Sequence, residues 1–237
     1  MQSLRCRNLT PLHGMMISMS DHLNLSADEV LTTTRSVRKR LDFDRPVSTE
    51  TIMECLEIAL QAPTGSNRQG WQWVFVSDDA KKLELQKLYS ENFEMYRQVP
   101  RPEYAPDDPR AQAAPRVVDS AQYLADHFHR APVLLVPCLE GRPDAANSAA
   151  FWGSLLPAVW SFMLALRERG LGSAWTTLHL PNGGEQKAAD LLGIPFDRYS
   201  QAGLFPIAHT VGTDFKLASR LPASQVSHWD EWGTSPS

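Results

Sequence analysis

One segment limits the possible folds of this chain more than any other, a predicted helix between residues 145 and 169 that is apolar on most of its faces. Its large apolar side chains are Phe151, Trp152, Leu155, Leu156, Val159, Trp160, Met163 and Leu164. Such a helix is expected either at the centre of a core or between two subunits, because its apolar surface must be shielded from water. Gly170 marks its expected end, since glycine tolerates the left-handed conformation that is common after a helix.

Four other segments predict a sheet for this helix to cover. They are rich in β-branched and aromatic residues, as strands usually are. The expected strands are Trp71–Ser77, Ala131–Glu140, a segment from about Ser173, and Leu204–Gly212. Together with the helices they predict an α+β or α/β class, with several helices around one sheet.

Capping and proline signals mark the other helices. Ser26-Ala27-Asp28-Glu29 has the form of a capping box, which predicts a first helix from Ala27 to about Thr33. The remaining helices are expected between Ser48 and Pro63, from about Asp78 onward, and over Glu185–Leu192.

Residues 91–119 are predicted to form a long loop outside the core. Proline recurs there at Pro100, Pro102, Pro106, Pro109 and Pro115. Because proline lacks the N–H that a helix needs, these residues are expected to break any long helix. Long ordered loops are often lids or binding loops, so Phe93, Tyr96 and Tyr104 are candidate walls of a substrate pocket. Ordinary surface packing explains these side chains equally well.

Composition limits the number of domains, the cellular compartment and the classes of partner. A chain of 237 residues that is 43% hydrophobic can bury one large core, and we expect a single domain over residues 25–237 after a tail of residues 1–24. Three cysteines lie far apart, which argues against a disulfide framework and favours the reducing cytoplasm. The apolar run Leu155–Leu166 contains Ser161 and is too short to span a bilayer. The net charge of -4 does not suggest a nucleic-acid partner.

Several common sites are absent from the sequence. Gly170-Leu171-Gly172 follows a helix and precedes a strand, which is the wrong order for a dinucleotide-binding glycine motif. The histidines show no metal-ligand spacing, and Gly153-Ser154 lacks the flanking pattern of a hydrolase nucleophile. We therefore predict no metal site and no nucleophilic catalytic residue.

A cluster of cations follows the first predicted helix. Arg35, Arg38, Lys39 and Arg40 fall within six residues. Cations near the end of a helix interact favourably with its dipole, which would make the cluster a solvated helix end. The other interpretation is a site for a phosphate or another anion, because guanidinium groups can donate two hydrogen bonds to phosphate oxygens.

Four motifs in order resemble the FMN-dependent nitroreductase superfamily. They are RSVRKRLDFDRPV, QAPTGSNRQGWQWVFV, ERGLGSAWTT at the end of the long helix, and VGTDFKLASRLP. Three features depart from the usual pattern: Thr34 stands where many relatives have a second arginine, Trp160-Ser161 replaces a Gln-Asn pair, and AWTTLHL replaces the commoner strand. Trp160 is expected to pack in a dimer core.

The resemblance implies a nitroreductase-like α+β fold with a mixed, mainly antiparallel sheet surrounded by helices. It also implies an intertwined homodimer with FMN at the subunit interface. The residues that match cofactor-binding positions are Arg35, Ser36, Arg38, Pro63, Thr64, Asn67, Gln69, Thr176, Thr177, Lys216 and Arg220. In this interpretation Arg35 and Arg38 bind the phosphate, while Lys39 and Arg40 stay on the solvated face.

The resemblance further implies hydride transfer from NADPH or NADH to FMN and then, in ping-pong order, to a nitroaromatic, quinone or similar acceptor. Two alternatives remain open at this point. One is a flavin-storing or flavin-sensing module, and the other is a different flavin-dependent dehydrogenase or dehalogenase on the same fold.

Overall fold

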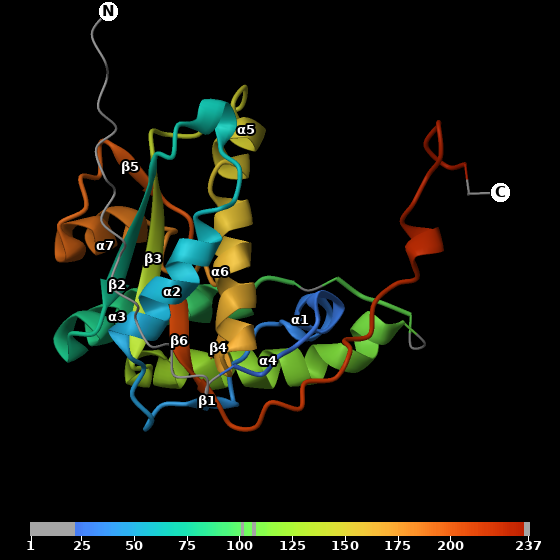
Figure 1. Ribbon diagram of the computed structural model, residues 1–237, viewed down its shortest axis with the longest axis horizontal. Coiled ribbons are helices and arrows are strands. Elements are labelled where there is room, and N and C mark those ends of the chain that lie inside the picture. Colours follow the sequence, from blue (N-terminus) through green and yellow to red (C-terminus); the bar gives the residue numbers. More distant parts are fainter. Residues whose placement is uncertain (1–21, 101, 106–107, 235–237) are drawn as a thin grey trace, which may run out of the picture.

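The computed structural model describes residues 22–100, 102–105 and 108–234, and it shows one sheet flanked by helices (Figure 1). Most of the predicted tail of residues 1–24 lies outside the described residues. Within its described part, the Leu23 amide donates to the Glu168 carbonyl at 2.8 Å.

The sheet confirms the predicted α+β class and mainly antiparallel pairing. Its strands are β1 (Leu41–Asp42), β2 (Trp71–Val76), β3 (Val133–Glu140), β4 (Leu171–Ser173), β5 (Tyr199–Gln201) and β6 (Phe205–Thr210). The order is β1-β6-β3-β2, with β4 beside β6 and β5 beside β3. These pairings are antiparallel, and an isolated parallel bridge joins Ser36 to Ser173.

The helices are α1 (Ala27–Thr33), α2 (Thr49–Ala59), α3 (Asp79–Arg97), α4 (Pro109–His127), α5 (Ser148–Gly153), α6 (Leu156–Glu168) and α7 (Gly184–Leu192). Short 3₁₀ turns are η1 (Gly65–Asn67), η2 (Phe128–Arg130) and η3 (Ala223–Gln225). The capping box of Ser26 and Glu29 is present at α1, and Ser48 caps α2. Gly193 ends α7 in the left-handed conformation. The capping and glycine signals therefore predicted these boundaries well.

The central strand β3 explains how the core is divided. Val133, Leu135 and Leu139 belong to the cluster that contains α2 and α6. The alternating residues Leu134, Val136 and Cys138 belong to the cluster that contains α3 and α7. Because successive side chains of a strand point to opposite faces, a strand covered on both faces must be apolar throughout. This is why Ala131–Glu140 reads as an unbroken apolar run.

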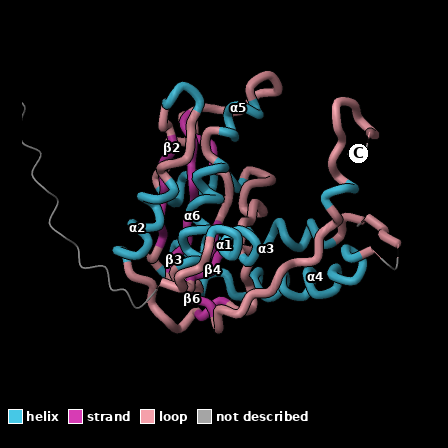
Figure 2. The backbone as a smooth tube through the Cα atoms, turned by 45° about the vertical axis from the view of Figure 1, so that its right-hand side comes forward, coloured by secondary structure: helices cyan, strands magenta, loops and turns pink. Residues whose placement is uncertain are grey.

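The long apolar helix is interrupted, contrary to the sequence prediction. Helix α5 ends at Gly153 and α6 begins at Leu156. Pro157 accounts for the break, because a continuous helix would need its missing N–H to donate to the Gly153 carbonyl. α6 still occupies the centre of one layer, with α2 beside it in Figures 1 and 2.

Among the described residues, one helical stretch is long and apolar enough to cross a membrane by length and composition alone. It covers Ser148–Glu168, with a mean hydropathy of 1.6, so it extends beyond the Leu155–Leu166 run judged too short from the sequence. In this fold 39% of its most apolar window is buried, and α6 places side chains such as Phe162 and Leu166 in the core.

Residues 91–119 are more helical than predicted. Helix α3 continues to Arg97, and α4 runs through Pro115. Pro109 occupies the start of α4, where a missing N–H costs nothing, and the Asp108 carboxylate accepts a hydrogen bond from the Arg110 amide at 2.7 Å. Pro115 is exposed, so water can satisfy the carbonyl that its ring leaves without a donor. Among the described residues of this segment, those between Arg97 and Pro109 are not helical.

The segment from Ser173 was also predicted wrongly as a longer strand. β4 ends at Ser173, and one isolated bridge then joins Thr176 to Leu204. Two side-chain hydrogen bonds fix this stretch where a strand would form a ladder of backbone hydrogen bonds. Trp175 Nε1 donates to the Ala202 carbonyl at 3.1 Å, and Thr176 Oγ1 donates to the Leu204 carbonyl at 2.5 Å. The chain therefore leaves the sheet where two of the predicted site residues lie.

Candidate functional site

The cationic cluster lines a cavity of about 720 Å³. Its walls are residues 35–40, one face of α4, Phe215 and residues 217–220. Arg35, Ser36, Arg38 and Arg220, all predicted cofactor-binding residues, lie in this lining. We call this space the basic cavity. It brings together residues that are almost two hundred positions apart in the sequence.

Residues 35–40, which we call the basic segment, are fixed against the sheet at Val37. The Val37 amide donates to the Ser173 carbonyl at 2.8 Å, and its side chain is buried. A Cβ on Gly172 would lie 3.1 Å from the Val37 side chain, so glycine permits this close approach. Arg38 and Ser36 flank Val37 and take their positions from it.

Arg35 is held in an unfavourable setting for a cation. Its Nη2 is buried without a hydrogen-bond partner, and its Nε donates a long 3.4 Å bond to the Thr33 carbonyl. Burial first, and then the charges of Arg220 and Arg40, lower the Arg35 pKa below its usual range. An anion placed here would supply both the missing acceptor and the missing countercharge.

Acidic neighbours neutralise two of the cations. Lys39 pairs with Asp119 at 2.5 Å, and Arg40 pairs with Asp214 at 2.6 Å. Among the described residues, no carboxylate pairs with the cavity-lining arginines Arg35, Arg38, Arg116 and Arg220. The basic cavity therefore keeps a positive charge that no described carboxylate balances.

A smaller cavity of about 290 Å³ adjoins the basic cavity, and Arg38 lines both. Thr176 and Thr177 lie in its wall with Trp175. Helix α3 supplies Tyr89, Phe93 and Tyr96. Burial lowers the pKa of Arg38 and raises the pKa of Tyr89 to about 12. We call this space the aromatic pocket.

Two of the three candidate wall residues thus face a pocket. Phe93 and Tyr96 line the aromatic pocket, whereas Tyr104 lies under the Arg110 guanidinium, whose Cζ is 4.3 Å from the tyrosine ring centroid.

Lys216 is exposed and does not line the basic cavity, although its neighbours Phe215 and Leu217 do. Phe215 supports the cations, with Arg40 at 4.2 Å and Arg167 at 5.0 Å from its ring centroid.

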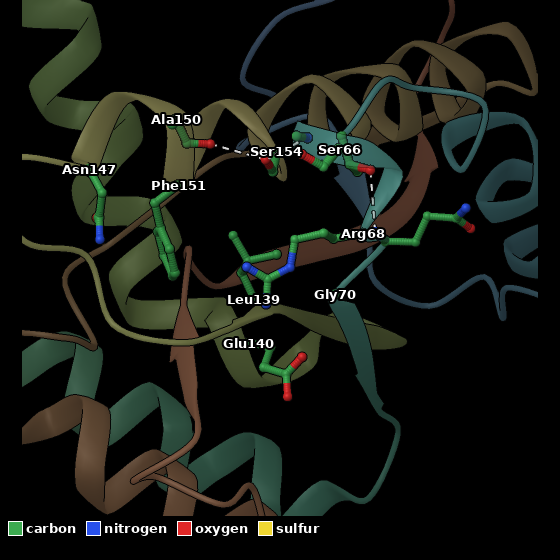
Figure 3. A pocket seen from close by; sticks show the side chains of 12 residues that line it. Ser66, Arg68, Gly70, Leu139, Glu140, Asn147, Ala150, Phe151 and Ser154 are labelled. Atoms are coloured by element: carbon green, nitrogen blue, oxygen red, sulfur yellow. Dashed lines mark hydrogen bonds between the residues drawn. The ribbon is translucent and has the colours of Figure 1, made fainter.

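The loop of residues 63–70 forms a third part of the predicted site. Asn67 and Gln69 have positive φ angles of 53° and 51°, and the Gln69 Nε2 donates to Asn67 Oδ1 at 2.9 Å. Ser154 anchors the loop, because its Oγ accepts from the Gly65 amide and donates to the Ala150 carbonyl, both at 3.0 Å (Figure 3). Thr64 Oγ1 accepts from the Gln69 amide at 3.2 Å. Pro63 is exposed, precedes this arrangement and lines neither the basic cavity nor the aromatic pocket.

This loop and the basic cavity lie at opposite ends of the sheet. The loop leads into Trp71, which pairs with Leu139 near one end of β3. The basic segment leads into Leu41, which pairs with Thr210 of β6, beyond the Val133 end of β3. A single chain therefore does not bring Asn67 and Gln69 to the arginines.

Sequence reasoning missed two residues of these surfaces. Ser154 fixes the loop, and Arg116 of α4 adds a fourth unpaired guanidinium to the basic cavity. No local motif marks either residue, since Ser154 at the end of α5 and Arg116 on α4 come beside the site only in the folded chain. Among the described residues, no group of histidine, cysteine or acidic side chains could hold a metal ion.

Comparison with known proteins decides the family. The model of the nitroreductase family matches residues 31–209, about three quarters of the chain. The chain belongs to the nitroreductase family. This match confirms the family resemblance and covers three of the four sequence motifs, with the basic segment, the loop of residues 63–70 and nearly all of β6. The fourth motif, VGTDFKLASRLP, lies beyond the matched residues.

Solved structures support the nitroreductase fold. The FMN- and NADPH-dependent nitroreductase NfnB of Sphigopyxis sp. strain HMH is 24% identical, with a TM-score of 0.63 over 88% of this chain and 100% of that chain. NfnB from Mycobacterium smegmatis, in complex with NADPH, is 18% identical, with a TM-score of 0.63 over 86% of this chain and 98% of that chain.

Another similar structure is an iodotyrosine deiodinase bound to FMN and 3-iodo-L-tyrosine, which is 20% identical. Its TM-score is 0.62 over 87% of this chain and 98% of that chain. At such identities the likeness shows the fold. A comparison with curated proteins finds no significant match.

Proposed function

We propose that this nitroreductase-family chain is an FMN-dependent oxidoreductase that uses NADPH or NADH to reduce a nitroaromatic, quinone or similar acceptor. The unbalanced charge of the basic cavity carries this proposal. A flavin mononucleotide ends in a phosphate of roughly two negative charges, which matches guanidinium groups that have no carboxylate partner.

The phosphate would be held first by Arg35 and Arg38, with Arg220 approaching from the C-terminal segment. The buried, unpartnered Nη2 of Arg35 supports this assignment, because a phosphate oxygen can accept from it. Ser36 adds a hydroxyl beside both arginines. Lys216 is a weaker candidate, since it lies outside the lining of the basic cavity.

The aromatic pocket supports a flat ring beside the phosphate. It begins at Arg38, where the basic cavity ends, and Thr176 and Thr177 line it. Phe93 and Tyr96 would form the wall against which the ring or the acceptor packs. When bound, FMN supplies the hydride chemistry, so the chain needs no nucleophile of its own. Its side chains position the ring and the substrates and exclude water.

A homodimer would complete the site. The loop with Thr64, Asn67 and Gln69 lies at the far end of the sheet, so we propose that it reaches the flavin of a second copy. An apolar groove of about 630 Å³ between α1, α2 and α6 supports this assembly. Leu31, 53% exposed, and Ile58, 47% exposed, line it, and Trp160 on α6 is 38% exposed. Burying such a surface against a second copy stabilises the assembly.

The proposal includes a ping-pong order, in which the oxidised nicotinamide leaves before the acceptor binds. It also places the protein in the cytoplasm, which the buried free thiols of Cys55 and Cys138 support. Cys6 lies outside the described residues.

The test is the double variant Arg35→Ala/Arg38→Ala. Hydrogen bonds to charged groups contribute about 1.5–3 kcal/mol each, so FMN affinity should fall about a hundredfold or more. Wild-type protein should purify with flavin absorbance bands that bleach on anaerobic addition of NADPH or NADH. The double variant should purify without flavin while keeping its circular dichroism spectrum.

A matched control is Lys81→Ala/Lys87→Ala, which removes two exposed cations of α3 that line neither cavity, and this variant should keep its flavin. Full flavin retention in the arginine variant would contradict the phosphate assignment. Flavin bands that never bleach with either nucleotide would favour the storage or sensing alternative. Wild-type protein that cannot be loaded with FMN would overturn the proposed function.

A further inference from the structure

A third cavity, of about 290 Å³, lies beside the loop of residues 63–70. Its walls combine apolar side chains of Leu139, Ala150 and Phe151 with polar groups of Asn147 and Ser154. Figure 3 shows the Arg68 side chain reaching into this space toward Phe151. We propose that this cavity is a subsite for the electron acceptor, and that Arg68 selects planar aromatic acceptors that carry a carboxylate or another anionic group.

Arg68 is free to bind a ligand. Its side chain forms no hydrogen bond or ion pair with any residue that the structure describes, and it is exposed. The nearby Glu140 is already engaged, because its Oε1 accepts from Arg198 Nε at 3.0 Å and from Nη2 at 2.8 Å. The carboxylate of Glu140 is thus balanced by Arg198. The cavity keeps the single positive charge of Arg68 for an incoming anion.

The location of the cavity connects it with electron transfer, and on this point the inference rests on the proposed function. Thr64 and Gln69 line the cavity and belong to the loop proposed to contact the flavin of a second copy. Arg68 lies between Asn67 and Gln69 in the chain. A ligand held by Arg68 would therefore lie next to the proposed flavin contacts.

The shape of this cavity and the chemistry of its lining define the class of acceptor. Phe151 offers an aromatic face, and Leu139 supplies an apolar surface that suits a flat ring. The Arg68 guanidinium can pair with a carboxylate through two parallel hydrogen bonds. For a nitro acceptor the balanced two-electron step is Ar–NO₂ + NAD(P)H + H⁺ → Ar–NO + NAD(P)⁺ + H₂O. In this step one nitro oxygen leaves as water.

The experiment compares two probes on FMN-loaded protein, 4-nitrobenzoate and the uncharged 4-nitrobenzyl alcohol. In wild-type protein kcat/KM should be higher for the benzoate. Arg68→Gln should lower the ratio of the two kcat/KM values roughly tenfold, since a hydrogen bond to a charged group is lost. Arg68→Lys should keep part of the preference. Because both probes use the same donor, effects on the donor half-reaction cancel in the ratio.

A second readout needs no turnover. Titration of the oxidised protein with 4-nitrobenzoate, followed by the flavin absorbance spectrum, should show roughly tenfold weaker binding in Arg68→Gln. Lys87→Gln removes one cation from the exposed face of α3 and serves as the control. In Lys87→Gln, the ratio of the two kcat/KM values and the affinity for 4-nitrobenzoate should equal those of the wild type.

An unchanged ratio in Arg68→Gln, or an equal loss in Lys87→Gln, would overturn the inference while leaving the proposed function intact. So would a wild-type protein that reduces the alcohol as well as the benzoate. A wild-type protein without flavin, or one that reduces neither probe, would instead overturn the proposed function and this subsite with it.

Discussion

His179 is a buried histidine that follows the pocket-lining Thr177 in the chain. It is completely buried, two residues after Thr177, and its Nε2 lies 3.2 Å from Gln201 Oε1. Gln201 Nε2 donates to the Glu185 carbonyl at 2.7 Å, so its oxygen faces the imidazole and His179 must carry its proton on Nε2. Nδ1 is then a buried acceptor without a partner. Protonating Nδ1 would place an uncompensated charge in the core.

The pH dependence of stability follows from this environment. Burial lowers the pKa of His179 from 6.5 to about 4. Between these values the unfolded chain binds the extra proton and the folded chain does not. Stability from this group is therefore complete above pH 6.5 and is lost as pH falls toward 4, by about 3 kcal/mol in total.

The measurement is an NMR titration of the imidazole signals, with His179→Gln used to assign the peak, together with urea unfolding at pH 7 and pH 5. The His179 signal should titrate near pH 4. Titration near the ordinary histidine value would show that water reaches the ring and that the stability argument is wrong.

At the scale of elements, the contact between β4 and the basic segment connects the fold with the cofactor site. A Cβ on Gly172 would lie 2.7 Å from Thr210 Cγ2 as well as 3.1 Å from the Val37 side chain. Thr210 also donates to the Gly170 carbonyl at 3.1 Å, so it cannot move without losing that bond. The approach of Val37 to Gly172 thus sets where Arg38 lies.

Gly172→Ala should therefore reduce both stability and FMN affinity. Overpacking of a buried contact costs about 1–3 kcal/mol, and the displaced basic segment should bind FMN several-fold more weakly. Urea unfolding and a fluorescence titration with FMN measure the two effects. Gly153→Ala is the matched control, since no atom lies within 4 Å of its added Cβ. A Gly172→Ala protein with wild-type FMN affinity would show that the packing of β4 against the basic segment does not affect FMN binding, and would refute this coupling.

At the scale of the whole molecule, the predicted site is divided between two ends of one sheet. The arginines lie near β1, and the loop with Asn67 and Gln69 lies next to the start of β2. The apolar groove between α1, α2 and α6 has no covering element within the described chain. In the proposed dimer, a second copy would cover the groove and bring the two parts of the site together.

Leu31→Asp tests this assembly. Leu31 is 53% exposed on α1, a helix without buried residues, so the substitution should leave the folded chain intact. A charge in an apolar interface is costly, and the variant should sediment as a monomer and lose most of its FMN. Leu83→Asp on α3, where Leu83 is 40% exposed, should stay dimeric and yellow. A Leu31→Asp protein that remains dimeric and flavin-bound would contradict the proposed interface.

Local signals in the sequence determined much of the fold. The capping box at Ser26, the Ser48 cap and Gly193 predicted helix ends, because capping depends on hydrogen bonds between residues close in the chain. The apolar run Ala131–Glu140 predicted a buried strand, which the structure shows as β3. The four motifs, in order, identified the family from residues that lie far apart.

Tertiary structure alone decided the rest, because it depends on contacts between distant residues. Pro115 was expected to break a helix, but its exposed position lets water replace the lost donor. No local pattern shows that Asp119 and Asp214 neutralise Lys39 and Arg40 while Arg35 and Arg38 stay unpaired. Nor does the sequence show that Glu140 pairs with Arg198 and leaves Arg68 open to a ligand. The sequence supplied the cations, and the folded chain decided which of them remain available for binding.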